Sequence, residues 1–269
     1  MRRYGLPQRP DPAIHPELAA LWDEIFSRKL TYITPTFRPM QELVPGIERR
    51  GGPQPDVMTV TNSSWSGGVV HATGSEKFTW VLGRWNVPDV APAAGGHGSW
   101  TALAWIGIDG GTDVTQIGTL QSVTGSSKNC YAFWEWWPHT WQAIMNFPVS
   151  FGDTMLGLLC LLSTTEAWFS LLNVTSGTHT GFTFTAPAGI TSSENQAEWI
   201  LERPEIGGTN AQLPNFGEIY FDSAMGGHGL DFVAEGGTDT VINMVVNGTT
   251  VATTTVETPT LIKIAYTGS

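Results

Sequence analysis

The chain has 269 residues, of which 41% are hydrophobic and 14% are charged, and its formal net charge is −11 at pH 7. This apolar content is sufficient for a buried core, so the composition excludes a largely disordered protein. The sequence has no apolar run of about 18 residues, and an acidic surface repels nucleic acid and anionic membrane, so neither is expected as a partner. The abundance of Gly, Ser and Thr favours an all-β protein with many turns.

The first 57 residues differ from the remainder in composition. Residues 1–50 carry eight basic and six acidic side chains, which leaves five basic and eighteen acidic side chains in the remainder. Pro16 begins a stretch with apolar residues at helical spacing, which predicts an amphipathic helix of about four turns. These positions are Leu18, Leu21, Trp22, Ile25, Phe26 and Leu30. Five prolines between Pro35 and Pro55 then predict an extended connector.

The sequence leaves two interpretations of residues 1–57 open. One is a basic arm or pro-segment that binds the acidic body near neutral pH and loosens as carboxylates become protonated. The other is a helix that packs on the body for stability alone. In either case we predict that residues 58–269 form a single β domain, because no later linker or repeat interrupts the chain.

From residue 59 onward, short apolar stretches between turn residues predict closely spaced strands. They cover residues 65–70, 78–88, 101–109, 130–137, 154–162, 167–174, 181–185, 196–202, 218–222 and 240–246. Asn247-Gly248 is typical of a two-residue hairpin turn, because both positions take positive φ. Such a series of strands predicts an antiparallel β-sandwich made of two sheets.

Three of these strands separate core side chains from polar ones, because alternate residues point to opposite sides of a sheet. In residues 196–202, Ala197, Trp199 and Leu201 share one face, and Glu198 and Glu202 lie opposite. If the three strands are neighbours, a single face collects Trp105, Asp109, Phe133, Glu135, Trp137, Glu198 and Glu202. This predicts an aromatic-walled groove with carboxylates in its floor, unless a second layer packs over these side chains.

Several kinds of site lack support in the sequence. The six histidines are scattered without HExxH spacing, and Cys130 and Cys160 form no CxxC pair, so we expect no metal site and no cofactor. No GxSxG motif indicates a serine triad, and the glycine-rich segments do not follow the order of a nucleotide-binding loop. The chemistry that remains uses carboxylates, amides and aromatic rings.

Seven short pieces then occur in a familiar order, at residues 64–68, 85–88, 104–110, 120–121, 135–138, 152–153 and 197–202. In this order the chain resembles the glutamic peptidases of the eqolisin family, acid endopeptidases with a β-sandwich of the concanavalin-like jelly-roll type. The resemblance implies protein or peptide substrates. It places the catalytic glutamine on Gln121 and the catalytic glutamate on Glu202. It also places Trp105, Asp109, Glu135 and Glu198 around the cleft in support.

In the mechanism that this resemblance implies, Glu202 takes a proton from the attacking water and passes it to the leaving amine. The Gln121 amide donates to the developing oxyanion. Neither group needs an imidazole base, which would be protonated in acid, so we expect an optimum at about pH 2–5. Gly125, Tyr131 and Arg203-Pro204 replace acidic or aromatic residues of the fungal pattern, which bears on pH optimum and substrate preference.

Two other functions are compatible with the residues. One is a glycan-binding sandwich, because an aromatic groove can stack on sugars. The other is a glycosidase that uses two of Glu135, Glu198 and Glu202, a chemistry with no required role for Gln121. The resemblance implies an extracellular protein with an inhibitory basic pro-segment, which suits residues 1–57. The residues after Met1, however, lack the apolar segment of a secretory signal.

Overall fold

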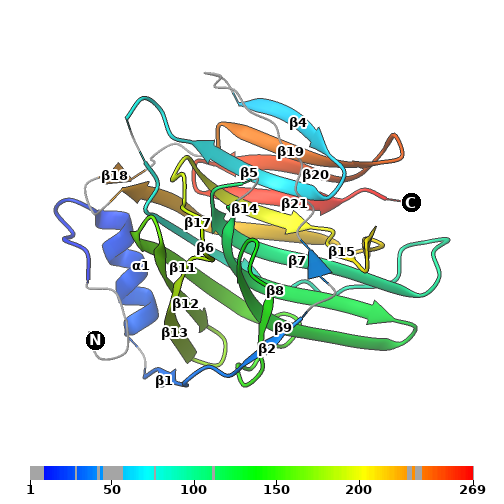
Figure 1. The fold of residues 1–269 in the computed structure, drawn as a ribbon, viewed down its shortest axis with the longest axis horizontal. Helices are drawn as coiled ribbons and strands as arrows, with labels where there is room; N and C mark the ends of the chain where they lie inside the picture. Colours follow the sequence, from blue (N-terminus) through cyan, green and yellow to red (C-terminus); the bar gives the residue numbers. More distant parts are fainter. Residues whose placement is uncertain are drawn as a thin grey trace.

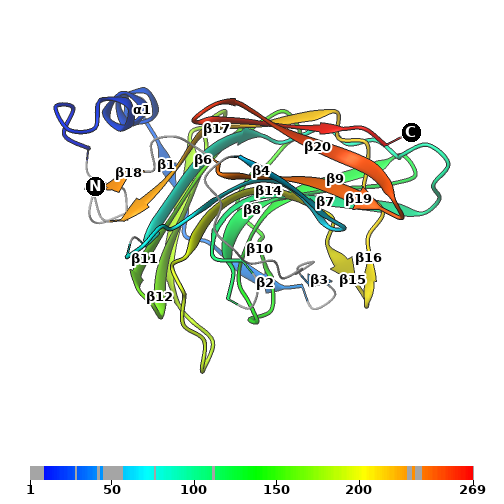
Figure 2. The same cartoon turned by 90° about the horizontal axis from the view of Figure 1, so that it is seen from above.

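The computed structural model describes residues 9–27, 29–40, 43–44, 57–75, 77–110, 113–228, 232–233 and 238–268. Two curved, mainly antiparallel layers pack face to face, with one helix on the outside (Figure 1 and Figure 2). This arrangement confirms the predicted β-sandwich. Within the described residues the only α-helix is α1 (Pro16–Phe26), and no helix there is long and apolar enough to cross a membrane.

We call the first layer the cleft sheet. Its strands, in spatial order, are β4 (Met58–Asn62), β19 (Thr240–Val246), β5 (Trp65–His71), β14 (Gln196–Glu202), β7 (Ser99–Ile108), β8 (Thr115–Thr124), β9 (Ser127–Trp136), β10 (Gln142–Ile144) and β2 (Phe37–Pro39). All neighbours run antiparallel apart from β4 and β19, which are parallel. The strands that carry the predicted site residues therefore lie side by side.

We call the second layer the outer sheet. Its strands, in spatial order, are β21 (Leu261–Tyr266), β17 (Glu218–His228), β6 (Trp80–Asn86), β11 (Thr154–Ser163), β12 (Glu166–Asn173), β13 (Thr178–Thr185) and β1 (Thr31–Tyr32). β20 (Thr249–Thr258) pairs with both β19 and β21 and so joins the two layers. The turn before β20 has positive φ at Asn247 and Gly248, 50° and 81°, as the sequence predicted.

Three further strands lie beside the layers. β18 (Phe232–Val233) pairs with the end of β17. β3 (Leu43–Val44), β15 (Glu205–Ile206) and β16 (Thr209–Asn210) form a small separate sheet. Because β15 begins three residues after Glu202, this small sheet lies close to the end of β14.

The core between the layers is formed by the faces that the sequence assigned to it. Ala104 and Ile106 of β7 and Trp199 and Leu201 of β14 are buried there. The Trp199 Nε1 donates to the Leu82 carbonyl of the outer sheet at 2.8 Å, which ties the two layers together. Each large apolar side chain buried in this way stabilises the fold by about 1.5–3 kcal/mol.

The other face of the outer sheet is covered by α1. Ile25 of the helix packs in one cluster with Leu82, Leu156 and Leu172 of the sheet. The helix has 11 residues and is therefore shorter than the predicted four turns, although Leu30 beyond its end packs on the same cluster. Cys130 packs against the core between the layers, whereas Cys160 lies under α1, so the two thiols are separated by a sheet and both are free.

Candidate active site

Three cross-strand rows of residues run over β14, β7, β8 and β9 of the cleft sheet. The first row is Glu198 on β14, Gly107 on β7, Gln116 on β8 and Glu135 on β9. The second is Ile200, Trp105, Gly118 and Phe133, and the third is Glu202, Leu103, Leu120 and Tyr131. Directly paired residues in an antiparallel sheet point to the same side about 5 Å apart, so all three rows line one face.

Trp105 orients the carboxyl group of Glu202. The indole Nε1 donates to Glu202 Oε2 at 2.8 Å, and both side chains are fully buried. The indole fits because two of its neighbours are glycines. A Cβ on Gly107 would lie 2.9 Å from the ring, and a Cβ on Gly118 would lie 2.5 Å from the Trp105 Cβ. Trp65 packs edge-on against Trp105, with ring centroids 5.3 Å apart, so Glu202 has an apolar, rigid surrounding.

Gln116 and Glu135 form the second polar pair on this face. The Gln116 Nε2 donates to Glu135 Oε2 at 2.8 Å, and the side chains are 0% and 1% exposed. Burial raises the pKa of Glu135 well above its usual value, and the nearby Glu202 carboxyl raises it further. The first and third rows therefore both place an acid on the same face of the sheet, Glu135 in one and Glu202 in the other.

Glu198 is the third buried acid. The Gln196 Nε2 donates to its Oε1. Burial raises the pKa of Glu198 well above its usual value, against the lowering effect of the Gln196 hydrogen bond, and Asp109 and Glu202 add to the increase. Glu135 and Glu198 therefore hold protons at pH values where an exposed glutamate is ionised.

Asp109 lies just after β7. It is not part of the three rows, and its carboxylate binds the loop that precedes β14. Its carboxylate accepts hydrogen bonds from the Ser193 hydroxyl at 2.9 Å and from the Glu194 and Asn195 backbone N–H groups at 2.9 and 2.7 Å. The Ser192 hydroxyl also donates to it. Asp109 has a φ of 61°, which orients its side chain toward the loop. It thus holds the segment that leads into β14, and this segment sets the position of Glu198.

The structure does not bring Gln121 to this face. Gln121 pairs with Ala102 on β7 and with Cys130 on β9, which both face the core between the sheets. Its Nε2 donates to Thr119 Oγ1 at 2.6 Å, and the same hydroxyl accepts from Trp85 Nε1 at 3.0 Å. Gln121 and Glu202 therefore point to opposite sides of the cleft sheet.

The carboxamide that does lie among the acids is Gln116, which the sequence reasoning missed. Residues 115–124 are not among the strands that the sequence predicts, so the sequence alone assigns no face to Gln116 or Gln121. Alternation along β8 would have placed these two residues on opposite sides of the sheet. Pairing of Gln116 with Gly107 and Glu135 then places it on the same face as the acids.

The Peptidase A4 family model matches residues 63–266. This range contains the whole cleft sheet except for β4 and β2, and every residue of the three rows. The chain belongs to the Peptidase A4 family. This membership confirms the resemblance to the eqolisin glutamic peptidases that the sequence pieces indicated.

Two named relatives of this family are similar over part of their length. Aspergillopepsin-2 of Aspergillus niger is 28% identical over 182 residues, which covers 61% of this chain and 64% of the relative. Scytalidopepsin B of Scytalidium lignicola is 29% identical over 140 residues, which covers 52% of this chain and 51% of the relative. The chain therefore spans about half to two thirds of the length of the curated relatives it matches.

Solved structures of Peptidase A4 proteins share the fold. Scytalido-glutamic peptidase, crystallised with a transition state analog inhibitor, matches with a TM-score of 0.62 and 22% identity over 76% of this chain and 98% of that chain. Aspergilloglutamic peptidase from Aspergillus niger matches with a TM-score of 0.58 and 26% identity over 62% of this chain and 99% of that chain. Both agree with the β-sandwich described above.

Unpaired polar atoms mark where this Peptidase A4 chain could meet a ligand. Gln116 Oε1, Glu135 Oε1 and Glu198 Oε2 are buried and have no hydrogen-bond partner within the described residues. Buried polar atoms are nearly always paired in folded proteins, so such a cluster indicates a place for water or substrate. In the same described residues, no group of His, Cys, Asp and Glu is arranged to hold a metal ion.

Proposed function

We propose that the chain is an acid endopeptidase that hydrolyses peptide bonds with water, using Glu202 and Gln116. One observation carries this proposal. Three buried acids and a carboxamide lie on one aromatic-lined face of a Peptidase A4 chain. Peptide hydrolysis needs a base for water, an acid for the departing amine and a donor for the oxyanion, and these side chains supply each of them.

Glu202 is the proposed base and acid. Its carboxylate, held by the Trp105 indole, takes a proton from the attacking water and returns it to the leaving nitrogen. Burial raises the pKa of Glu135 and of Glu198, whereas Glu202 is the acid that accepts the Trp105 indole N–H, so Glu202 is the one assigned the role of base. The reaction then works in acid, where a histidine base would be protonated.

Gln116 is the proposed donor to the oxyanion. Its Nε2 points across the first row toward Glu135, on the same side of the sheet as Glu202. An amide keeps its N–H groups at every pH, so this donor is unaffected by acid. Gln121, the glutamine implied by the family resemblance, is less suited because the body of the sheet lies between it and Glu202.

The N-terminal segment is the proposed inhibitor of this face. β2 pairs with β10 at one border of the cleft sheet, and the Met40 N–H donates to the Trp141 carbonyl at 2.8 Å. Met40 packs against the cleft-side cluster that contains Trp141 and Phe133. β3 then pairs with β15, just after Glu202. β2 and β3 both lie on the concave side of the cleft sheet (Figure 2).

We call β2 and β3 the strap, because they pair with β10 on one side of the rows and with β15, just after Glu202, on the other. Pro39 at the end of β2 and Leu43 at the start of β3 can be at most about 14 Å apart. The three glutamates are at most 1% exposed in the full chain, so a substrate can reach them only after something moves.

Denatured casein and polysaccharides, each incubated with the protein at pH 3 and pH 7, test the activity. We expect casein cleavage at pH 3 alone, and a loss of about 10²–10⁴-fold in kcat/KM for Glu202→Gln. Gln116→Leu should lose about 10²–10³-fold, whereas its matched control Gln121→Leu should keep the parent rate. A loss confined to Gln121→Leu would return the amide role to that residue, and cleavage by Glu202→Gln at the parent rate would refute the peptidase proposal.

The mass of the protein after incubation at pH 3 tests the role of the N-terminal segment. Proteolytic removal should leave a product that begins after β3 and is active without a lag. An intact mass in a fully active sample would exclude removal and leave displacement as the only way to open the cleft.

A further inference from the structure

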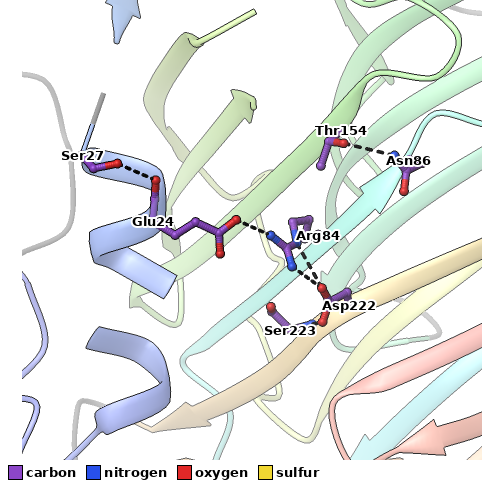
Figure 3. Close-up of polar contacts among 7 residues, drawn as sticks. All are labelled: Glu24, Ser27, Arg84, Asn86, Thr154, Asp222 and Ser223. Carbon is purple, nitrogen blue, oxygen red and sulfur yellow. Dashed lines mark hydrogen bonds and ion pairs between the residues drawn. The ribbon is translucent and has the colours of Figure 1, made fainter. Parts of the chain in front are cut away.

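Figure 3 shows the main polar tie between α1 and the outer sheet. The Arg84 Nη1 on β6 donates to Glu24 Oε1 on the helix at 2.9 Å, and the Arg84 Nε donates to Asp222 Oδ2 on β17 at 3.2 Å. Arg84 is thus shared between a carboxylate of the helix and one of the sheet. The Glu24 side chain is 56% exposed, so this ion cluster orients the helix and contributes little to its affinity.

His179 on β13 lies beneath the segment that follows α1. The side chain is buried, and its Nε2 lies 2.9 Å from the Ser170 Oγ on β12. Tyr32 of β1 covers it, with ring centroids 5.7 Å apart. The Ile33 N–H donates to the His179 carbonyl at 2.9 Å, which joins the segment directly to this residue.

Among the described residues, no carboxylate lines the space between α1 and the sheet where His179 lies. A cavity of about 310 Å³ lies there, and α1 contributes only apolar side chains to its wall, among them Leu21, Trp22 and Ile25. The titratable neighbours are Tyr32 of β1 and Cys160 of β11, and burial raises the pKa of the Cys160 thiol to about 12. Of the α1 acids whose side chains are described, Asp23 is paired with Arg9 and Glu24 with Arg84.

We propose that His179, supported by the Glu24–Arg84–Asp222 cluster, is an acid-released latch that holds α1 and β1 on the outer sheet near neutral pH. When the imidazole gains a proton, the cation lies against a largely apolar wall while α1 and β1 are docked, and it becomes fully hydrated only on release. This change favours release.

The direction of the pH effect follows from the burial of His179. Burial lowers its pKa from the ordinary 6.5 to about 4 in the docked state. After release the ring is hydrated and its pKa returns toward 6.5. Between these two values the released state binds a proton that the docked state does not, so docking weakens as pH falls, by about 300-fold at most. Below about pH 4 both states are protonated and the effect is complete.

Release of this latch connects pH to the proposed inhibition. β1 and β2 are separated by only four residues, so freeing α1 and β1 removes the anchor that precedes the strap over the cleft. This consequence rests on the proposed function, but the latch itself does not. It can therefore be measured in the full-length Glu202→Gln chain, where self-cleavage is prevented.

Hydrogen–deuterium exchange of peptides from residues 16–33, corrected for the intrinsic pH dependence of exchange, measures the docking of α1 and β1. The parent should lose protection there between pH 6.5 and pH 4 while residues 99–136 stay protected. His179→Asn cannot gain a proton and should keep the segment docked at pH 4. His139→Asn, at the turn after β9, is the matched control and should behave like the parent.

Equal loss of protection in the parent and in His179→Asn would overturn the proposal, because release would then follow from surface carboxylates alone. Protection of residues 16–33 down to the pH of global unfolding would overturn it as well. If His179→Asn does not fold, His179→Gln serves, since its amide can reach Ser170. Casein cleavage by the active chain is scored separately, so failure of the latch and failure of the peptidase assignment are distinguishable.

Discussion

Gln116 and Glu135 lie directly opposite each other on β8 and β9, and the Gln116 Nε2 donates to Glu135 Oε2 at 2.8 Å. The raised pKa of Glu135 makes this a contact between an amide and a neutral acid over much of the acid and neutral range. The site contains three buried acids, and burying an ionised carboxylate in apolar surroundings is costly, so a neutral Glu135 lowers that cost. It leaves Glu202, oriented by Trp105, as the acid that the proposed reaction uses.

Replacing Trp105 with Phe tests the orientation of Glu202. The change removes the indole N–H and keeps an aromatic ring, so we expect kcat on casein to fall by about 10–100-fold with little change in KM. Trp134→Phe is a suitable control, because the Trp134 Nε1 is buried in the core and has no hydrogen-bond partner among the residues that the structure describes. Equal losses in both variants would mean that packing, not the hydrogen bond, is responsible.

Replacing Glu135 and Glu198 with glutamine tests their protonation. Both acids have raised pKa values, so they keep protons in the folded state that the unfolded chain loses above about pH 4.5. The unfolding free energy of the parent should therefore fall as pH rises from 4.5 to 7, and that of Glu135→Gln/Glu198→Gln should fall less. At pH 7 the double variant should melt at a higher temperature than the parent.

The melting temperatures of both proteins, measured from pH 4 to pH 8, give the comparison. Glu166→Gln, at an exposed position on β12, controls for the change in net charge. A double variant whose pH dependence matches that of the parent would show that the two acids are ionised in the folded protein.

The sequence predicted the faces of β7, β9 and β14 because each strand has one face that is entirely apolar over the predicted stretch, and the acids or large rings of the site lie on the other. β8 has no such contrast, since Ile117 and Val123 share a face with Thr119 and Gln121, while Leu120 shares the other with Gln116. Its faces are set by ten pairs with β7, a long-range register that local alternation does not contain. The short strands β2 and β3 likewise exist through their pairing with β10 and β15.

The matched pair Gln116→Leu and Gln121→Leu also differs in stability. Leucine at position 121 removes a buried Oε1 that has no partner, and Thr119 keeps its bond from Trp85, so the unfolding free energy should stay within about 1 kcal/mol of the parent or rise. Leucine at position 116 leaves both Glu135 oxygens unpaired among the described residues and should lower the unfolding free energy by about 1–3 kcal/mol. Urea unfolding at pH 5 measures both, and the reverse order would contradict the faces described here.

Asp109→Asn tests whether the loop before β14 positions the acids. Asparagine tolerates the φ of 61° at this position, so the substitution changes the acceptor and not the backbone. Its amide nitrogen cannot accept, and at least two of the four bonds from residues 192–195 should be lost, at a cost of about 2–4 kcal/mol. Because this loop leads into Glu198, we expect casein cleavage to fall along with the melting temperature. Asp153→Asn provides the comparison, because Asp153 is a half-buried acid just before β11, outside the cleft, and it also accepts a backbone N–H, that of Ser150. A variant at position 109 that melts and cleaves like the parent would show that the loop keeps its conformation without the Asp109 carboxylate.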